Sequence, residues 1–220
     1  MRWFGGKTTI NKIIKTMIYS DFLLISAGGL LTPIYAIFVT KQIAGATIAV
    51  VGFTTTIFWV SKSLAQFPIS WIADKIKGER DDYVFLVVGS LLASAVPLFY
   101  YFLVSQVWHV YLLESFNGLA SAMMVPAWLA IYGRHIDKGR ENTEWMLHSN
   151  AVGLGYAVAA SVGGLMAQQF GFRIIFLLVS AMMFLGTAVL VIIKQEIIDS
   201  DYRNGFRVAE AHKIKDFIQH

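Results

Sequence analysis

The sequence has no cysteine, only four prolines and a charged fraction of 15%. Without cysteine there is neither a disulfide scaffold nor a cysteine-based metal site. The few prolines and the lack of polar low-complexity tracts argue against long disordered regions. The five histidines have neither H-x-x-x-H nor H-E-x-x-H spacing, so we expect no metal and no cofactor. No arrangement of a nucleophile beside a base is visible, and we therefore expect no enzyme.

Apolar residues, by contrast, are abundant. The hydrophobic fraction is 56% and the mean hydropathy is +0.60, whereas soluble domains are about 45–50% apolar even when glycine is counted. A soluble core of this length does not need so much apolar surface. The composition therefore predicts an integral membrane protein in a lipid bilayer.

A helix that crosses a bilayer needs about 20 mostly apolar residues. Six stretches of the sequence meet this length, and they predict an all-α membrane protein with six transmembrane helices. The expected helices cover residues 16–38, 46–69, 83–104, 107–131, 149–169 and 174–193. The expected domains are a cytoplasmic N-terminus (1–15), a six-helix transmembrane domain (16–194) and a cytoplasmic C-terminal tail (195–220).

Lysine and arginine predict the orientation, because cytoplasmic loops carry an excess of both. If the helices alternate in direction, one side of the membrane receives only Lys41 and Arg173. The other side receives both termini and the basic loops at 71–82 and 133–143. We therefore expect a multi-pass protein of the cell membrane with both termini in the cytoplasm. The net charge of +4 reflects this topology, and no nucleic-acid partner is expected.

An internal repeat is visible in the spacing of acids and prolines. Asp21 precedes Pro33 by twelve residues, as Glu114 precedes Pro126, and an aromatic residue follows each proline two positions later. The two sets are about 93 residues apart. Three helices are an odd number, so the second copy would be inverted in the membrane. Inverted three-helix repeats are a building unit of secondary transporters.

The loop "SWIADKIKGERDD" (70–82) resembles a loop of the major facilitator superfamily. Members of that family carry G-x-x-x-D-R/K-x-G-R/K-R/K between helices 2 and 3. Asp74 and Lys75 fall on the acid and the base of this pattern, Gly78 comes one residue late, and Arg80 takes a late basic position. The resemblance implies one six-helix half of such a transporter, similar to the N-terminal half.

The family resemblance also implies a role for this loop. In the family it latches the two six-helix halves together on the cytoplasmic side. We expect Asp74 to bind a basic residue at the cytoplasmic end of a helix, with Arg134 as the choice. The alternative is that the loop charges are only solvated groups at the membrane surface.

The fifth helix contains "GYAVAASVGG" (155–164), which is similar to the antiporter pattern G-x-x-x-G-P-x-x-G-G of the same family. Gly155, Gly163 and Gly164 fit this pattern, and Ala159 stands for a glycine. Small residues at this spacing let helix backbones approach closely. We expect the face with Gly155, Ala159 and Gly163 to turn toward a second six-helix unit.

Ionisable residues at membrane depth are costly and commonly functional. Asp21 and Lys62 lie at similar depths, so we expect them to pair; the alternative for Lys62 is to extend its amine to the interface. A desolvated carboxyl such as Glu114 can carry a proton at neutral pH, and Asn117 lies on the same helix face. These four residues are candidates for proton or substrate binding, although a purely structural role is the alternative. We interpret His148 as an interface residue.

The resemblance implies a secondary active transporter, or its N-terminal half, that moves a small solute by alternating access. Proton-coupled efflux is one form that such transport takes. The expected partners are a small-molecule substrate and a second six-helix half, which is either a second copy of the chain or separately encoded. The alternative functions are a non-transporting membrane assembly module and an inactive truncated fragment.

Overall fold

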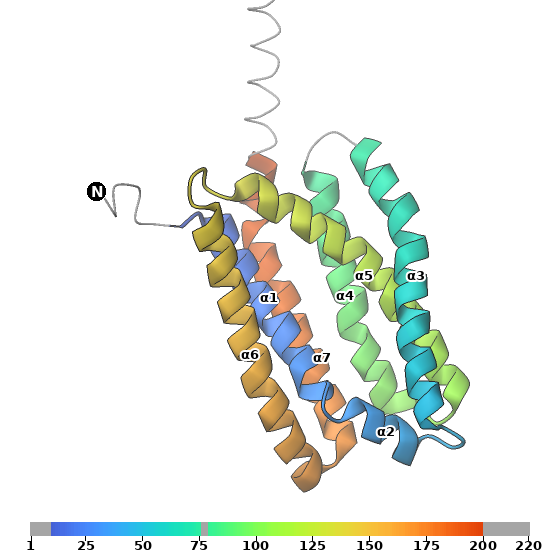
Figure 1. Cartoon of the computed structure of the whole chain (residues 1–220). Helices are drawn as coiled ribbons and strands as arrows, with labels where there is room; N and C mark the ends of the chain where they lie inside the picture. Colours follow the sequence, from blue (N-terminus) through green and yellow to red (C-terminus); the bar gives the residue numbers. More distant parts are fainter. Residues whose placement is uncertain (1–9, 76–78, 200–220) are drawn as a thin grey trace, which may run out of the picture.

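The computed structural model describes residues 10–75 and 79–199, and these residues form helices joined by short turns. Six long helices run side by side, and one short helix lies at the end of the bundle (Figure 1). They are α1 (Lys12–Leu31), α2 (Tyr35–Gln42), α3 (Ile48–Lys75), α4 (Arg80–Leu103), α5 (Val107–His135), α6 (Glu141–Phe170) and α7 (Phe172–Leu190), which a 3₁₀ turn follows at Val191–Ile193. No strand occurs within these ranges, so the all-α prediction is confirmed.

Most of these helices are suited to a bilayer. Five are long and apolar enough to cross a membrane, namely α1, α3, α4, α6 and the segment Phe172–Asp199 that contains α7. α5 is as long as the others, with 29 residues, but it carries Glu114 and Asn117 and is not one of these five.

The first predicted helix is broken, contrary to the expected span of 16–38. α1 ends at Leu31, and α2 begins only at Tyr35. Pro33 lies between them, and proline interrupts a helix because it lacks an N–H and its ring clashes with the preceding turn. The break turns α2 across the end of the bundle in Figure 1, so that Tyr35 belongs to a separate element.

Both ends of the predicted transmembrane domain also extend further than expected. α1 already begins at Lys12, where the side-chain oxygen of Asn11 accepts a hydrogen bond from the N–H of Ile13 at 3.0 Å. Such a cap satisfies a backbone donor that the first helical turn leaves unpaired. At the other end the helix continues to Asp199, and Ile197 is fully buried. The boundary expected at Lys194 therefore falls inside a packed helix.

The packing of the helices has the symmetry that the repeat predicted. α1 packs against α6 and α7, while α5 packs against α3 and α4. α4 and α7 pack against each other. Exchanging α1 with α5, α3 with α6 and α4 with α7 leaves this pattern unchanged. The hydroxyls of Ser94 and Thr187 are 3.3 Å apart and their residues are 93 positions apart, so equivalent positions of the two repeats meet where α4 crosses α7.

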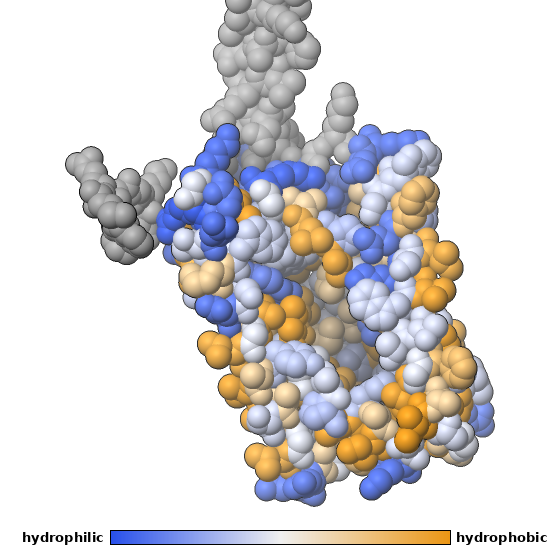
Figure 2. Space-filling view, in the orientation of Figure 1, coloured by the Kyte–Doolittle hydropathy of each residue, from blue (hydrophilic) through white to orange (hydrophobic). Residues whose placement is uncertain are grey.

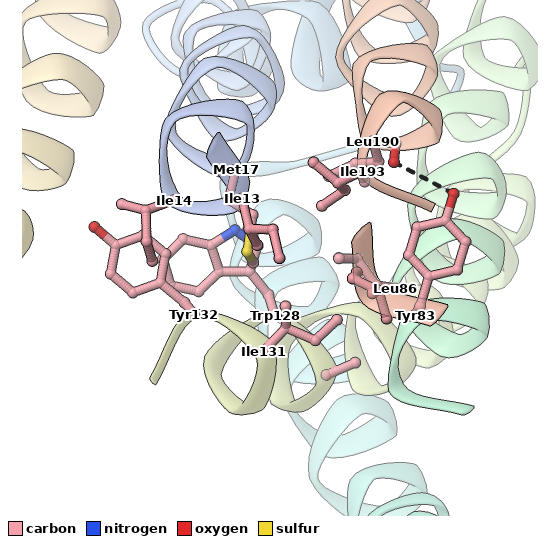
Figure 3. Packing of buried hydrophobic residues seen from close by; sticks show 12 residues of the cluster. Ile13, Ile14, Met17, Tyr83, Leu86, Trp128, Ile131, Tyr132, Leu190 and Ile193 are labelled. Carbon is pink, nitrogen blue, oxygen red and sulfur yellow. Dashed lines mark hydrogen bonds between the residues drawn. The ribbon is translucent and has the colours of Figure 1, made fainter. Parts of the chain in front are cut away.

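An apolar cluster closes the bundle at the end where α1 begins (Figure 3). Its members come from α1, α4, α5 and the end of α7, and Ile14, Met17 and Leu86 are fully buried. The hydroxyl of Tyr83 donates to the carbonyl oxygen of Leu190 at 3.3 Å, which joins α4 to α7 there. A second cluster at the opposite end includes Phe38 of α2. The candidate site lies beside this second cluster, whose residues Val96, Tyr100 and Phe176 form part of its wall.

The small residues of α6 make a very close contact with α1. A Cβ atom added to Gly163 would lie 2.2 Å from the carbonyl oxygen of Leu30, and one added to Gly155 would lie 2.3 Å from the Ser26 hydroxyl. Ala159 is buried in the same contact. The face expected to meet a second six-helix unit is thus occupied by α1, because α1 offers its own small residues at the same level.

The fourth small residue of that pattern lies elsewhere. A Cβ atom added to Gly164 would meet no atom within 4 Å, so Gly164 has no part in this contact. The equivalent interface of the other repeat is also close, because a Cβ on Gly118 of α5 would lie 2.5 Å from the carbonyl oxygen of Phe58 in α3. Backbone-to-backbone packing therefore fixes both the α1–α6 and the α5–α3 pairs.

Candidate functional site

A cavity of about 380 Å³ lies among α1, α2, α4, α5 and α7. Figure 2 shows that this face of the molecule is hollowed between the side formed by α1 and α6 and the side formed by α3 and α5. Apolar side chains dominate the wall, and a few polar groups interrupt it, as is typical of small-molecule sites. The lining residues are Gly28, Leu31, Thr32, Tyr35, Ala93, Val96, Pro97, Tyr100, Glu114, Asn117, Phe176, Val179 and Met183.

Glu114 is the acidic group of this cavity, and side chains from three helices hold it. Its Oε1 accepts hydrogen bonds from the hydroxyl of Tyr100 at 2.7 Å and from that of Tyr35 at 3.1 Å. Its Oε2 accepts a weaker hydrogen bond from the amide of Asn117 at 3.5 Å. The two tyrosine oxygens are themselves 2.9 Å apart. Three oxygen atoms from α2, α4 and α5 therefore form one compact cluster.

The Glu114 cluster has neutral partners and two open sides. Arg173 is exposed at the start of α7 and is not among the hydrogen-bond partners of Glu114. On the side away from the main cavity, a second opening of about 190 Å³ is lined by Tyr35, Thr54, Thr55, Phe58, Glu114 and Asn117. The carboxyl group can thus exchange a proton or a bound polar group on either side of the tyrosine pair.

A second buried acid lies on α1, and its partner is not the one expected. The imidazole Nε2 of His148 lies 2.5 Å from Oδ2 of Asp21, and these side chains are only 15% and 14% exposed. Lys62 instead places its amine 4.7 Å from the centre of the Trp59 ring on its own helix. The predicted pair of Asp21 with Lys62 is therefore wrong, because α1 packs against α6 whereas α3, which carries Lys62, packs against α5.

His148 was misjudged because its helix begins earlier than predicted. The expected fifth helix started at residue 149, which left His148 at the membrane surface. α6 in fact starts at Glu141, so His148 lies two turns inside it. An acidic first turn preceded by a glycine is a start signal that was available in the sequence, since Glu141 and Glu144 follow Gly139.

Three aromatic rings surround the imidazole of His148. The ring centres of Trp128 and Tyr132 on α5 lie 4.7 and 5.6 Å from it, and that of Trp145 on α6 lies 6.1 Å away. Trp128 and Tyr132 stack on each other at 4.6 Å. The hydroxyl of Tyr132 donates to the carbonyl oxygen of Glu144 at 2.8 Å. The rings are thus held in place by packing and by a backbone contact.

Comparison with known proteins identifies the family. The model of the Major Facilitator Superfamily matches residues 19–215. The chain belongs to this superfamily. It is therefore a multi-pass membrane protein of a transporter family, not an enzyme, and the resemblance seen in its loops is confirmed.

Two curated relatives of the superfamily are similar to this chain. An uncharacterised MFS-type transporter of Methanocaldococcus jannaschii is 28% identical over 148 residues, which are 67% of this chain and 36% of the relative. The proton-coupled antiporter flippase LtaA of Staphylococcus saprophyticus is 24% identical over 140 residues, which are 63% of this chain and 34% of the relative. The chain thus spans about a third of the length of these curated relatives.

A solved transporter structure has the same fold. The crystal structure of the POT family transporter PepTSo matches with a TM-score of 0.73 and 17% identity, over 85% of this chain and 38% of that chain. At this identity the likeness concerns the fold alone. It supports the inverted-repeat architecture of six helices.

The superfamily loop between α3 and α4 differs in detail from the expectation. Asp74 and Lys75 are exposed at the end of α3, and Lys75 lies over the ring of Trp71. Arg134 binds Oδ2 of Asp82 at 2.5 Å, so the predicted pair of Asp74 with Arg134 is wrong. Asp82 lies in the first turn of α4, which packs directly against α5.

The other two residues of the predicted loop motif are Gly78 and Arg80. Gly78 lies outside the described residues, and Arg80 is the exposed first residue of α4. Beside them, Glu79 lies 3.4 Å from His135, and both side chains are nearly buried at 7% and 9% exposure. The contact between α4 and the end of α5 therefore contains two acid–base pairs that sequence reasoning did not assign.

Proposed function

We propose that this chain forms one six-helix half of a secondary active transporter that moves a small solute by alternating access. The observation that carries the proposal is the cavity in which Tyr35 and Tyr100 hold Glu114. A carboxyl group at this depth is costly and is retained where it binds something. The apolar wall and the single acidic cluster favour a small solute with an apolar body and one cationic or hydrogen-bonding group.

The chemistry of the cluster supports an exchange at Glu114. Each tyrosine hydroxyl has one proton to donate, so two donations to Oε1 use both hydroxyls. A solute that donates to Oε1 of Glu114 competes with these hydroxyls. Where it displaces one of them, it releases Tyr35 or Tyr100 into the cavity. Because Tyr35 belongs to α2 and Tyr100 to α4, such an exchange changes a contact between helices. This is how binding in the cavity would bias the two states of the transporter.

A twelve-helix active unit is part of this proposal. Only 6% of the apolar segment of α3 and 17% of that of α6 are buried, against 56% for α1. α3 carries large exposed side chains, among them Phe53, Trp59, Leu64, Phe67 and Trp71. A second six-helix unit, either another copy of the chain or a separately encoded half, would cover part of these faces and enclose the cavity.

The direction and the coupling ion complete the proposal. The excess of lysine and arginine on one side supports an orientation with both termini in the cytoplasm. Proton-coupled export is supported by the acidic cluster, which needs only a proton to become neutral, and by the similarity to an antiporter flippase. The latch role implied for Asp74 and Lys75 stays a proposal as well.

The test combines oligomeric mass with proton flux. The purified chain, alone or with a candidate second half, is weighed in mild detergent and then reconstituted in liposomes that enclose a pH-sensitive dye. We expect a twelve-helix assembly whose proton flux falls at least about tenfold in Glu114→Gln, which removes the titrating group. Glu141→Gln is the matched control, because Glu141 is exposed in the first turn of α6.

Three results would each contradict a part of this proposal. A strict monomer that still transports would exclude the twelve-helix unit. Unchanged flux in Glu114→Gln would exclude the role of Glu114, and a verified twelve-helix assembly without any flux would exclude transport.

A further inference from the structure

We propose that Asp21 and His148 form a proton-binding site that ties α1 to α6. The site is separate from the cavity, since neither residue lines it. The proposal adds a second proton-binding site, beside Glu114, to the proposed transporter, and in that respect it rests on the proposed function. Proton binding itself does not require transport, and it is tested independently below.

The first observation is the isolation of the Asp21 carboxylate. Among the described residues, the imidazole of His148 is the one side chain placed to satisfy it, at 2.5 Å from Nε2 to Oδ2. A nearly buried carboxylate strongly favours a protonated partner, because an unpaired charge away from water is costly. A hydrogen bond between two charged groups is also stronger than a neutral one.

The second observation is the set of aromatic rings around the imidazole. A cation within about 6 Å of an aromatic ring centre is attracted to the ring face. Trp128 and Tyr132 lie within that distance, at 4.7 and 5.6 Å, and Trp145 lies just beyond it at 6.1 Å. The imidazole of His148 thus lies between one carboxylate and three aromatic rings.

Of the described titratable groups around His148, Asp21 is the one in direct contact with the imidazole. α1 contributes Asp21 itself, and Lys15, two turns earlier, is exposed. α5 contributes the hydroxyl of Tyr132, which is engaged with a backbone carbonyl. α6 contributes Glu144, whose Oε2 accepts a hydrogen bond from the N–H of Asp137 at 3.2 Å. α7 has Arg173 as its one charged residue, at the opposite end of the helix.

The proton balance of the site follows from the two ring nitrogens. With the proton bound, both nitrogens carry hydrogen, Nε2–H donates to Asp21, and the pair is neutral overall. On release, the proton leaves Nδ1 for water, Nε2–H still donates to Asp21, and the pair has a net charge of −1. The tie between α1 and α6 is then a weaker, neutral-donor hydrogen bond beside an uncompensated carboxylate. Proton release therefore loosens this end of the α1–α6 contact.

The packing makes this tie effective. Along the rest of their contact, α1 and α6 meet through small residues: Gly29 and Gly163 each lie against the backbone of the other helix, and Gly155 lies against the side chains of Ser26 and Phe22. That surface has no charged pair among the described residues other than Asp21 with His148. On the described α1–α6 surface, no other ion pair therefore compensates a change in the charge of Asp21 and His148.

Nitrogen-15 NMR of the histidine-labelled full chain in detergent or nanodiscs tests the proposal. His148→Gln identifies the His148 signal among those of the five histidines. We expect this signal in the wild type to change from doubly to singly protonated as a single step when the pH is raised over the range in which the chain stays folded. We expect Asp21→Asn to move the midpoint down by about one pH unit or more, which is a tenfold or larger loss of proton affinity. Trp128→Leu should move it in the same direction by less.

Two controls separate this site from the others. His109→Gln alters a histidine whose Nδ1 accepts backbone hydrogen bonds at the far end of α5, and it should leave the midpoint unchanged. Glu114→Gln should leave it unchanged as well. A wild-type His148 signal that stays neutral, or stays protonated, over the whole pH range overturns the proposal without any mutant. An unchanged midpoint in a folded Asp21→Asn variant also overturns it.

Flux measurements distinguish this proposal from the proposed function. If His148 titrates as expected but verified twelve-helix assemblies carry no flux, transport is wrong and the proton site stands. If flux is present and His148 does not titrate, the proton site is wrong and transport stands.

Discussion

Asp21 and Glu114 occupy equivalent positions of the two repeats, about 93 residues apart, yet they bind different partners. Two tyrosine hydroxyls and an amide hold Glu114, whereas an imidazole holds Asp21. The first set of partners is neutral at any physiological pH, while the second can gain or lose a charge. The inverted repeat thus determines where an acid is buried, and the partner determines what that acid can do.

The surroundings of the two acids differ in the same way. Thr55, which lines the opening beside Glu114, lies 93 residues before His148. Tyr35 and Trp128 are likewise equivalent by position. The break at Pro33 moves Tyr35 onto α2 and toward Glu114, while Pro126 lies within the continuous helix α5 and leaves Trp128 beside His148. Because only the first repeat is broken at its proline, tyrosine hydroxyls surround Glu114, whereas aromatic rings surround His148, the partner of Asp21.

The close helix contacts give the largest expected effect. Gly163→Ala should destabilise the protein by about 3 kcal/mol, since the new Cβ would overlap the backbone of Leu30 and overpacking is costly. Gly118→Ala in the equivalent α5–α3 contact should cost a similar amount. Thermal unfolding in detergent measures both. The neighbouring Gly164→Ala is the control, and it should gain about 0.5–1 kcal/mol from helix propensity because its surroundings are open. Equal behaviour of Gly163→Ala and Gly164→Ala would show that α1 and α6 are not in close contact.

The Glu114 cluster can be tested by removing one tyrosine hydroxyl at a time. Tyr100→Phe should cost about 1 kcal/mol, because it removes a 2.7 Å hydrogen bond at a nearly buried site. Tyr35→Phe should cost less, since its bond is longer at 3.1 Å. Chemical unfolding followed by tryptophan fluorescence gives the order. If Tyr35→Phe proved the costlier change, Tyr100 would not be the principal donor to Glu114.

The two acids near the α3–α4 connection should also differ. Asp82→Asn should cost about 1 kcal/mol at low salt, because Asp82 is nearly buried and its partner Arg134 is partly exposed. Asp74→Asn should change stability by less than about 0.5 kcal/mol, as expected of an exposed side chain. Adding salt should reduce the first effect. A larger effect for Asp74→Asn would restore the predicted latch pair.

Replacing Lys62 should have the smallest effect. Lys62→Met removes a contact with the ring of Trp59 that is worth about 0.5 kcal/mol at an exposed site. The NMR signal of His148 should not move in this variant, since Lys62 lies on the helix that packs against α5. A shifted signal would mean that Lys62 acts on the Asp21 pair after all.

Much of the architecture could be predicted from sequence, because apolar length and the spacing of acids and prolines are local properties. The pairing of side chains could not, since it depends on which helices are neighbours. Asp21 and Lys62 lie at similar depths, but depth does not tell whether α1 packs against α3 or α6. The small residues Gly155, Ala159 and Gly163 predicted a close contact without naming the helix that fills it. His148 was missed through one helix boundary that was placed eight residues too late.

In mechanical terms, the molecule is a four-helix frame with one further helix packed firmly on each side. α1, α4, α5 and α7 brace one another, whereas α3 is attached chiefly to α5 and α6 chiefly to α1. Each outer helix is therefore coupled to the frame along one main line of contact. A load on the open face, from a solute or from a second six-helix unit, reaches the frame through α3 into α5 and through α6 into α1. These two receiving helices are the ones that carry Glu114 and Asp21.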